Sequence, residues 1–190
     1  MITEELKNKN YNVLKKKLSS IGVDVSKFDE MLGDKLINAS FSISNENGCA
    51  YDGSLIHVVL RTLTLYAIKL NDMLPENLKV DQNSLVKVCL LSHISKCEMF
   101  VKNNNQWEVE KRGMVYTYAK SDIALKMGMK SLILSQNLGI AFTPEEIEAM
   151  VVMDRTADDK QSEFYSGKLS SVVKMANELT FLEIRNKKEN

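Results

Sequence analysis

The chain has 190 residues, a length that suits one domain or one domain with a small extension. Its 25 basic and 25 acidic side chains cancel, so the net charge does not indicate binding to nucleic acid or to an anionic membrane. No apolar run approaches the roughly 20 residues that a membrane span needs, and the first residues lack the pattern of a signal peptide. We therefore expect a cytoplasmic or virion-associated protein that is neither membrane-inserted nor secreted through a signal peptide.

The first third of the chain has helical patterning. Thr3 is predicted to cap a helix that runs to about Ser20 and ends at Gly22. Ser26 is predicted to open a second, short helix, with Asp29 in the capping-box position. The three cysteines of the chain are too few for a disulfide framework, and they indicate buried thiols in a reducing compartment.

The middle of the chain combines two apolar helices with a change of period. Residues 54–71 and about 82–100 are strongly apolar, which predicts two mostly buried helices. From residue 106 to 118 apolar and polar residues alternate around Lys111-Arg112-Gly113, which predicts a β-hairpin.

The last third is again helical. Ser121 is predicted to cap a helix that ends at Gly139, and Thr143-Pro144-Glu145-Glu146 has the capping residue, proline and acid of a helix start. Residues 155–167 are polar and predict a loop, and residues 168–185 predict a final helix. The predicted fold class is all-α, with one small hairpin.

Four short segments, read in chain order, carry a resemblance to a known family. They are Ala50–Ile56 (AYDGSLI), Leu90–Lys96 (LLSHISK), Lys130-Ser131 and Met175–Leu179 (MANEL). They resemble the A-Y-E-G-G-L-L, L-L-H-D-L-x-K, G-H-G-E-K-S and A-D-x-L patterns of the HD-domain metal-dependent phosphohydrolases, especially those of bacteria and phages. The resemblance implies an HD-like helical bundle over residues 41–185, with an N-terminal helical extension at 1–40 and a disordered tail at 186–190.

In that family, histidines and aspartates from separate helices hold metal ions that activate water against a phosphate ester. The side chains that supply such ligands are imidazoles and carboxylates. Aligned with the family, this sequence has other residues at most of these positions, and the degenerate positions are His57 or Val58, Ser92, His93, Met127, Met153, Asp154 and Asn177. The resemblance therefore implies a pseudoenzyme with no metal, no other cofactor and no catalytic residues.

Other sites remain open on the sequence alone. Cys89, His93 and Cys97 recur every four residues and could hold zinc, although two core cysteines and a hydrogen-bonded histidine explain the same spacing. Asp154 and the aspartates after it could bind a cation or form a solvated loop. A divergent phosphohydrolase that uses His57, His93 and Asp154 on nucleotides, or a nucleotide sensor without catalysis, is the alternative function.

The predicted hairpin supplies the most specific surface. Trp107, Lys111, Arg112, Tyr116 and Tyr118 could form a partner-binding surface there, or the aromatic residues could cover the hairpin's own core face. We expect an inactive HD-like domain that serves as a structural or interaction protein. Self-assembly or protein partners are expected, and the resemblance suggests a component of a phage virion or of its assembly.

Overall fold

The computed structural model describes residues 2–153 and 166–186. Over these residues the chain is mainly helical, with one two-stranded antiparallel sheet, so the predicted all-α class with a small hairpin-like element is confirmed. No described helix is long and apolar enough to cross a bilayer. In chain order the elements are α1 (Glu4–Ser20), α2 (Phe28–Met31), α3 (Gly33–Ile37), η1 (Asn45–Asn47), α4 (Ser54–Val58), η2 (Val59–Leu63), α5 (Thr64–Met73), α6 (Gln82–Leu91), α7 (Lys96–Met99), β1 (Phe100–Lys102), α8 (Gln106–Arg112), β2 (Tyr116–Tyr118), α9 (Met127–Asn137), α10 (Pro144–Val152) and α11 (Lys168–Asn186).

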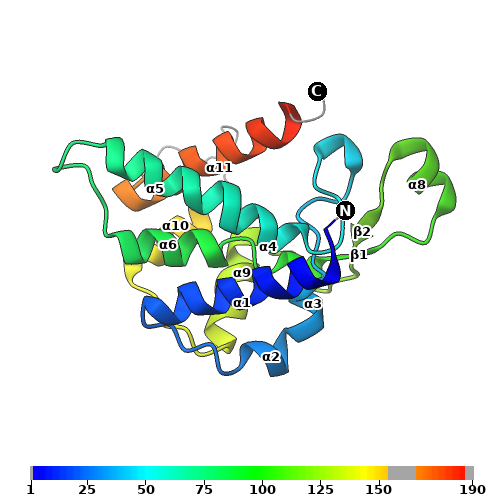
Figure 1. The fold of residues 1–190 in the computed structure, drawn as a ribbon, viewed down its shortest axis with the longest axis horizontal. Helices are drawn as coiled ribbons and strands as arrows, with labels where there is room; N and C mark the ends of the chain where they lie inside the picture. Colours follow the sequence, from blue (N-terminus) through cyan, green and yellow to red (C-terminus); the bar gives the residue numbers. More distant parts are fainter. Residues whose placement is uncertain (1, 154–165, 187–190) are drawn as a thin grey trace.

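The N-terminal helices belong to the same core as the rest of the chain. The Thr3 hydroxyl accepts a hydrogen bond from the Leu6 amide and caps α1 as predicted. Apolar side chains of α1, among them Leu14 and Leu18, are buried in one cluster with residues from α4, α6, α10 and α11. Figure 1 shows α1 lying along α4 and α6, with α2 and α3 beneath it.

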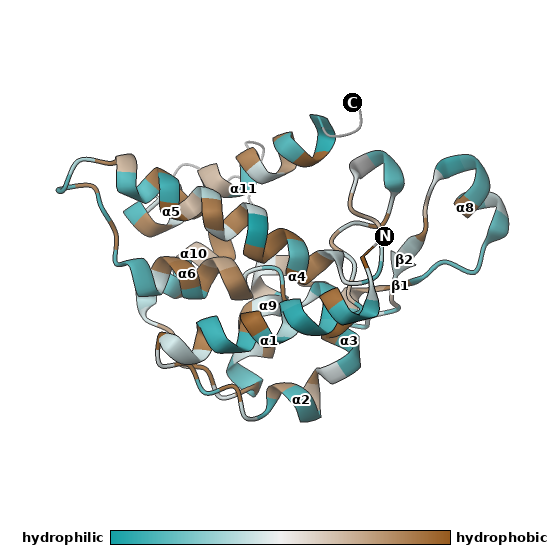
Figure 2. Ribbon diagram, in the orientation of Figure 1, coloured by the Kyte–Doolittle hydropathy of each residue, from teal (hydrophilic) through white to brown (hydrophobic). Residues whose placement is uncertain are grey.

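The predicted helix over residues 54–71 is one rod with a wide turn inside it. The rod begins at Ser54, passes through a π turn at Val59–Leu63 and continues as α5. The Thr64 hydroxyl donates to the Val59 carbonyl across 2.6 Å, which satisfies an oxygen within this turn. The later part of the rod lies against α6 and α11 (Figure 1), and Figure 2 shows hydrophobic stretches along these central helices.

The predicted start of α10 is confirmed in full. The Thr143 hydroxyl accepts from the Glu146 amide, and the Glu146 carboxylate accepts from the Thr143 amide. The same carboxylate lies 2.7 Å from the ammonium of Lys87 on α6. One buried acid therefore both closes the first turn of α10 and ties this helix to α6.

Three predicted helix boundaries are wrong, and local side-chain hydrogen bonds explain two of them. The Ser26 amide binds the Asp24 carboxylate, and α2 begins only at Phe28 with no side-chain cap. The Ser121 hydroxyl and Ile123 bond each other in a tight turn, so α9 begins at Met127 instead. The helix predicted to run to residue 100 ends at Leu91 and is followed by a turn, a short helix and a strand.

The predicted hairpin has its strands in other places. Strand β1 pairs with β2 in the register Phe100↔Tyr118 and Lys102↔Tyr116, whereas residues 106–112, predicted as a strand, form helix α8. The Asn105 side chain caps α8, and Gly113, at φ 60°, ends it in the left-handed conformation. Residues 100–118, which we call the arm, stand out from the body (Figure 1), and much of α8 is hydrophilic (Figure 2).

Candidate functional site

The centre of the molecule holds a buried histidine bonded to an amide. His93 lies in the turn between α6 and α7, and its Nε2 is 3.0 Å from Oδ1 of Asn177 on α11. Both residues are buried. Burial, helped by the charge of Lys96, lowers the pKa of His93 well below its usual value, and the bond to Asn177 only partly opposes this. The structure thus brings together two of the positions that the resemblance places at the metal site, as a neutral imidazole and an amide.

Serine hydroxyls fill the space between this turn and α9. The Ser92 hydroxyl, where the family has a histidine, donates to the Cys89 carbonyl at 3.4 Å within its own helix. The Ser131 hydroxyl donates to the Ser95 hydroxyl at 2.8 Å, and the Ser95 hydroxyl lies 3.2 Å from the Met127 carbonyl. The bonds of Ser95 to Ser131 and to the Met127 carbonyl hold α9 against the turn, while Ser92 bonds only to the main chain of its own helix.

A buried lysine is the feature that the sequence reasoning missed. The Lys96 ammonium donates to the Phe41 carbonyl at 2.7 Å and lies 3.6 Å from the centroid of the Phe41 ring. The rings of Phe100 and Phe181 follow at 5.9 and 5.8 Å. Burial lowers the pKa of Lys96 to about 7, and the Cys49 thiol partly opposes this shift. The sequence offered one signal for this residue, which is a lysine at the end of the apolar segment LLSHISK. A lysine that such a segment carries into the core needs a partner there, because lysine is almost never fully buried without one.

Phe41 joins the lysine to the histidine. Its ring lies 5.1 Å from the His93 ring and 5.5 Å from the Phe181 ring, in tilted arrangements. Main-chain carbonyl, aromatic rings and amide thus surround the two basic side chains. Among the described residues, no three histidine, cysteine, aspartate or glutamate side chains gather as a metal site would require.

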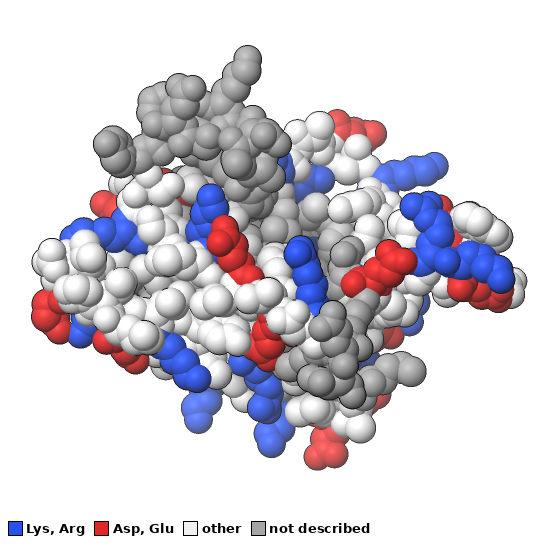
Figure 3. Space-filling view, turned by 90° about the horizontal axis from the view of Figure 1, so that it is seen from above, with Lys and Arg blue, Asp and Glu red and all other residues white. Residues whose placement is uncertain are grey.

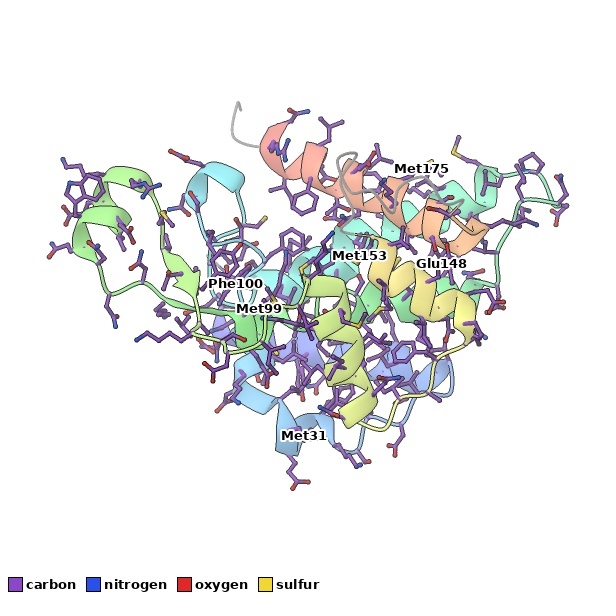
Figure 4. The ribbon with its side chains drawn as sticks, turned by 180° about the vertical axis from the view of Figure 1, so that it is seen from behind. Met31, Met99, Phe100, Glu148, Met153 and Met175 are labelled. Carbon is purple, nitrogen blue, oxygen red and sulfur yellow. The ribbon has the colours of Figure 1, made fainter. Side chains whose placement is uncertain are left out.

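The remaining positions of the implied metal site lie apart from this cluster or outside the described residues. His57 and Val58 line a cleft of about 400 Å³, together with Cys49 and Tyr51. Met153 is buried in the core (Figure 4). Asp154 and the acidic stretch after it, which were candidates for cation binding, fall outside the described residues.

The possible zinc ligands Cys89, His93 and Cys97 have another explanation in the fold. Cys89 and Cys97 are buried thiols, and burial raises the pKa of each to about 12. A thiol binds zinc as the thiolate, which burial disfavours here. Since His93 bonds Asn177, the spacing of these three residues is explained by core packing.

The arm presents most of the residues predicted for a partner surface. Trp107 and Tyr118 are each 61% exposed, and Lys111 and Arg112 are exposed as well. Figure 3, which views the molecule from above, shows acidic and basic side chains close together at the arm. Tyr116, by contrast, is buried and lies beneath this surface.

Tyr116 and Lys102 fix the base of the arm to the body. The Tyr116 hydroxyl donates to the Asp52 carboxylate at 2.5 Å, and the Lys102 ammonium lies 2.9 Å from the same group. Burial alone would raise the pKa of Asp52, but these two hydrogen bonds, together with the positive charges of Lys102 and Lys7, outweigh it and lower the pKa. The Asn45 amide also donates to the Gly113 carbonyl at 2.9 Å. The arm is therefore anchored near both strands, while α8 has no buried residue.

Comparison of the chain with protein-family models, with curated proteins and with solved structures gave no match.

Proposed function

We propose that the chain is an HD-like domain without catalysis, which acts as a structural or interaction protein. The observation that carries this proposal is the buried bond between His93 and Asn177. The resemblance places metal-binding aspartates at both positions. The pair instead consists of an imidazole held neutral and an amide, which keeps the shape of aspartate but lacks its charge.

The chemistry of the surrounding groups supports the same proposal. A divalent ion that activates water needs several imidazole or carboxylate ligands and an open coordination position. The neighbours of His93 are the Phe41 ring, over which the Lys96 ammonium already lies, and the positive charge of Lys96, which repels a metal ion. A cation brought to this point would have to displace a packed core.

The arm supplies the interaction half of the proposal. It holds an exposed tryptophan and charges of both signs on a helix that has no buried residue. Exposed aromatic residues next to charges are typical of binding surfaces. We therefore propose that the body holds the arm in place and that the arm contacts the partner protein.

Restoring the family ligands tests the absence of catalysis. The variant carries Ser92→His, His93→Asp and Asn177→Asp, and both proteins are incubated with Mn²⁺, desalted and analysed for metal and for hydrolysis of nucleotides. We expect the native protein to retain no stoichiometric metal and to hydrolyse none of the nucleotides, because its core lacks the ligands. We expect the variant to retain more Mn²⁺ than the native chain.

A native protein that keeps one metal ion per chain, and that loses it together with nucleotide hydrolysis on His93→Ala, would contradict the proposal. Circular dichroism of each variant controls for folding. Glu178→Asp, a conservative change at an exposed position next to Asn177 on α11, serves as the matched control.

A further inference from the structure

A groove lies on the body at the base of the arm. The β2–α9 connection and the exposed side of α9 border a cavity of about 310 Å³. Its apolar lining includes Tyr118, Ile123, Leu125 and Ile133, which are 61%, 62%, 37% and 40% exposed. Met99, another lining residue, is seen at the base of the arm in Figure 4. A concave site with a mostly apolar lining and a few polar groups is typical of binding pockets.

The rim of this groove carries charges of both signs. Glu98, Lys120 and Lys130 line the cavity beside the apolar residues. A partner that matches it therefore has an apolar anchor flanked by an acid and a base.

The tip of the arm has this composition. Trp107 is the single tryptophan of the chain, and its side chain is largely exposed on α8. Residues three and four positions further on lie on the same side of a helix, so Glu110 and Lys111 flank the indole. Tryptophan is the residue type most enriched among those that dominate the binding energy of interfaces.

We propose that the groove at the base of the arm binds the arm of a second copy of this chain. The proposal rests on the proposed function and names its partner. A two-fold axis between two antiparallel arms would place each tip at the other's base, so that both contacts form at once and the assembly closes as a dimer. In that arrangement Trp107 enters the groove, Glu110 faces Lys120 and Lys130, and Lys111 faces Glu98.

The distribution of exposed apolar residues favours a second copy over an unrelated protein. Thirteen large apolar side chains are exposed among the described residues, and six of them belong to the arm or the groove: Val101, Trp107, Tyr118, Ile123, Leu125 and Ile133. Reciprocal exchange covers both sets in one interface, whereas a partner held by the arm alone would leave the groove open.

Sedimentation velocity and tryptophan fluorescence over a range of concentrations test the proposal on the full chain. We expect a monomer–dimer equilibrium, with the emission of Trp107 moving to shorter wavelength as the dimer forms, because the indole leaves water. Trp107→Ala and Ile133→Asp should each weaken dimerisation at least 30-fold or so, the size of effect typical of a central anchor.

Mixing the two variants gives the decisive measurement. A heterodimer of Trp107→Ala and Ile133→Asp keeps one intact contact, in which the arm of the second variant enters the groove of the first. The other contact carries both changes, but either change alone already removes it, so their costs are not additive. We therefore expect the mixture to associate more strongly than either variant alone. Leu182→Asp, a comparable change at an exposed position on α11, is the control and should dimerise like the native chain.

Three results would overturn the inference. They are a strict monomer whose fluorescence does not depend on concentration, a dimer that Leu182→Asp abolishes, and a mixture that associates no better than its components. None of them touches the metal and hydrolysis measurements, so failure of the dimer and failure of the non-catalytic assignment can be told apart.

Discussion

The buried Lys96 ammonium is partnered by aromatic rings and a main-chain carbonyl and by no carboxylate that the described residues show. Its folded-state pKa of about 7 lies below the value of 10.5 that it has in an unfolded chain. Between these two values the unfolded chain binds a proton that the folded chain does not, so the contribution of Lys96 to the free energy of unfolding rises with pH. It is complete above the unfolded pKa and is lost as the pH falls through the folded pKa.

We predict that Lys96→Met removes this pH dependence. From pH 7 to 8.5 the free energy of unfolding of the native chain should rise by about 1–2 kcal/mol relative to that of the variant, as a single group with this shift requires. Urea unfolding at several pH values measures the difference. Both proteins contain the same three cysteines, so thiol ionisation in the unfolded chain cancels. A pH-independent difference would show that Lys96 stays charged in the core.

Gly128 shows how one residue sets the distance between two helices. A Cβ at this position would lie 2.0 Å from the carbonyl oxygen of Met150 on α10, which is main chain and cannot turn aside. The resemblance places Met127, the residue before this glycine, at a degenerate position of the metal site. In the structure this glycine has a packing role, because it lets α9 and α10 approach.

We predict that Gly128→Ala destabilises the protein by about 2–3 kcal/mol, as overpacking in a tight core does. On an exposed helix the same change is stabilising, so the sign of the effect identifies the cause. Gly167→Ala is the matched control, since its Cβ would meet only the flexible carboxylate of Glu148 at 2.9 Å. Thermal and urea unfolding of the three proteins measure the effect, and equal stabilities would show that α9 and α10 can move apart at no cost.

At the scale of elements, the sequence predicted long periodic helices better than short pieces. The starts of α1 and α10 were found because a capping side chain and an acidic first turn precede a sustained apolar period. The strands of the arm were misplaced because each has three residues, too few for alternation to identify them, and their pairing spans the intervening α8. The Asn105 cap and the Gly113 stop were in the sequence, but the aromatic alternation outweighed them in the prediction.

The candidate site was predictable only in part, for a related reason. Sequence comparison by position identified His93 and Asn177 separately, whereas their contact joins residues 84 positions apart and depends on how α11 packs. The role of Lys96 depends on Phe41, which lies 55 positions away in the sequence, and on Phe181, which lies on α11. No local pattern reports such convergence.

The whole molecule consists of a body with one core and an arm fixed to it near its strands. The Asn103 amide donates to the Val115 carbonyl at 3.0 Å, which makes these two residues a hydrogen-bonded pair, so an Asn-Gly turn can replace residues 104–114 and close a tight hairpin. We predict that this shortened chain folds with a loss of about 1–2 kcal/mol. The loss comes mainly from the bond between the Asn45 amide and the Gly113 carbonyl, since α8 buries no residue and shortening a loop reduces the entropy cost of closing it.

The same variant should remain a monomer at concentrations at which the native chain dimerises, and sedimentation velocity measures this. Unfolding of the body on removal of the tip would show that α8 contributes to the core after all. A shortened chain that still dimerises would place the interface elsewhere.

The π turn at Val59–Leu63 has a consequence for how this rod can change. A wide turn holds one residue more than the regular helix needs for the same rotation, so the segments before and after it keep the phase of a regular helix that is one residue shorter. The segment before the turn, α4, contacts α1, and the segment after it, α5, contacts α6 and α11. Loss of a single residue within this turn would therefore leave a regular α turn and keep the inward side chains of both ends directed at the core. The same loss elsewhere in the rod would turn one end by roughly 100° against the other and direct its inward side chains toward solvent.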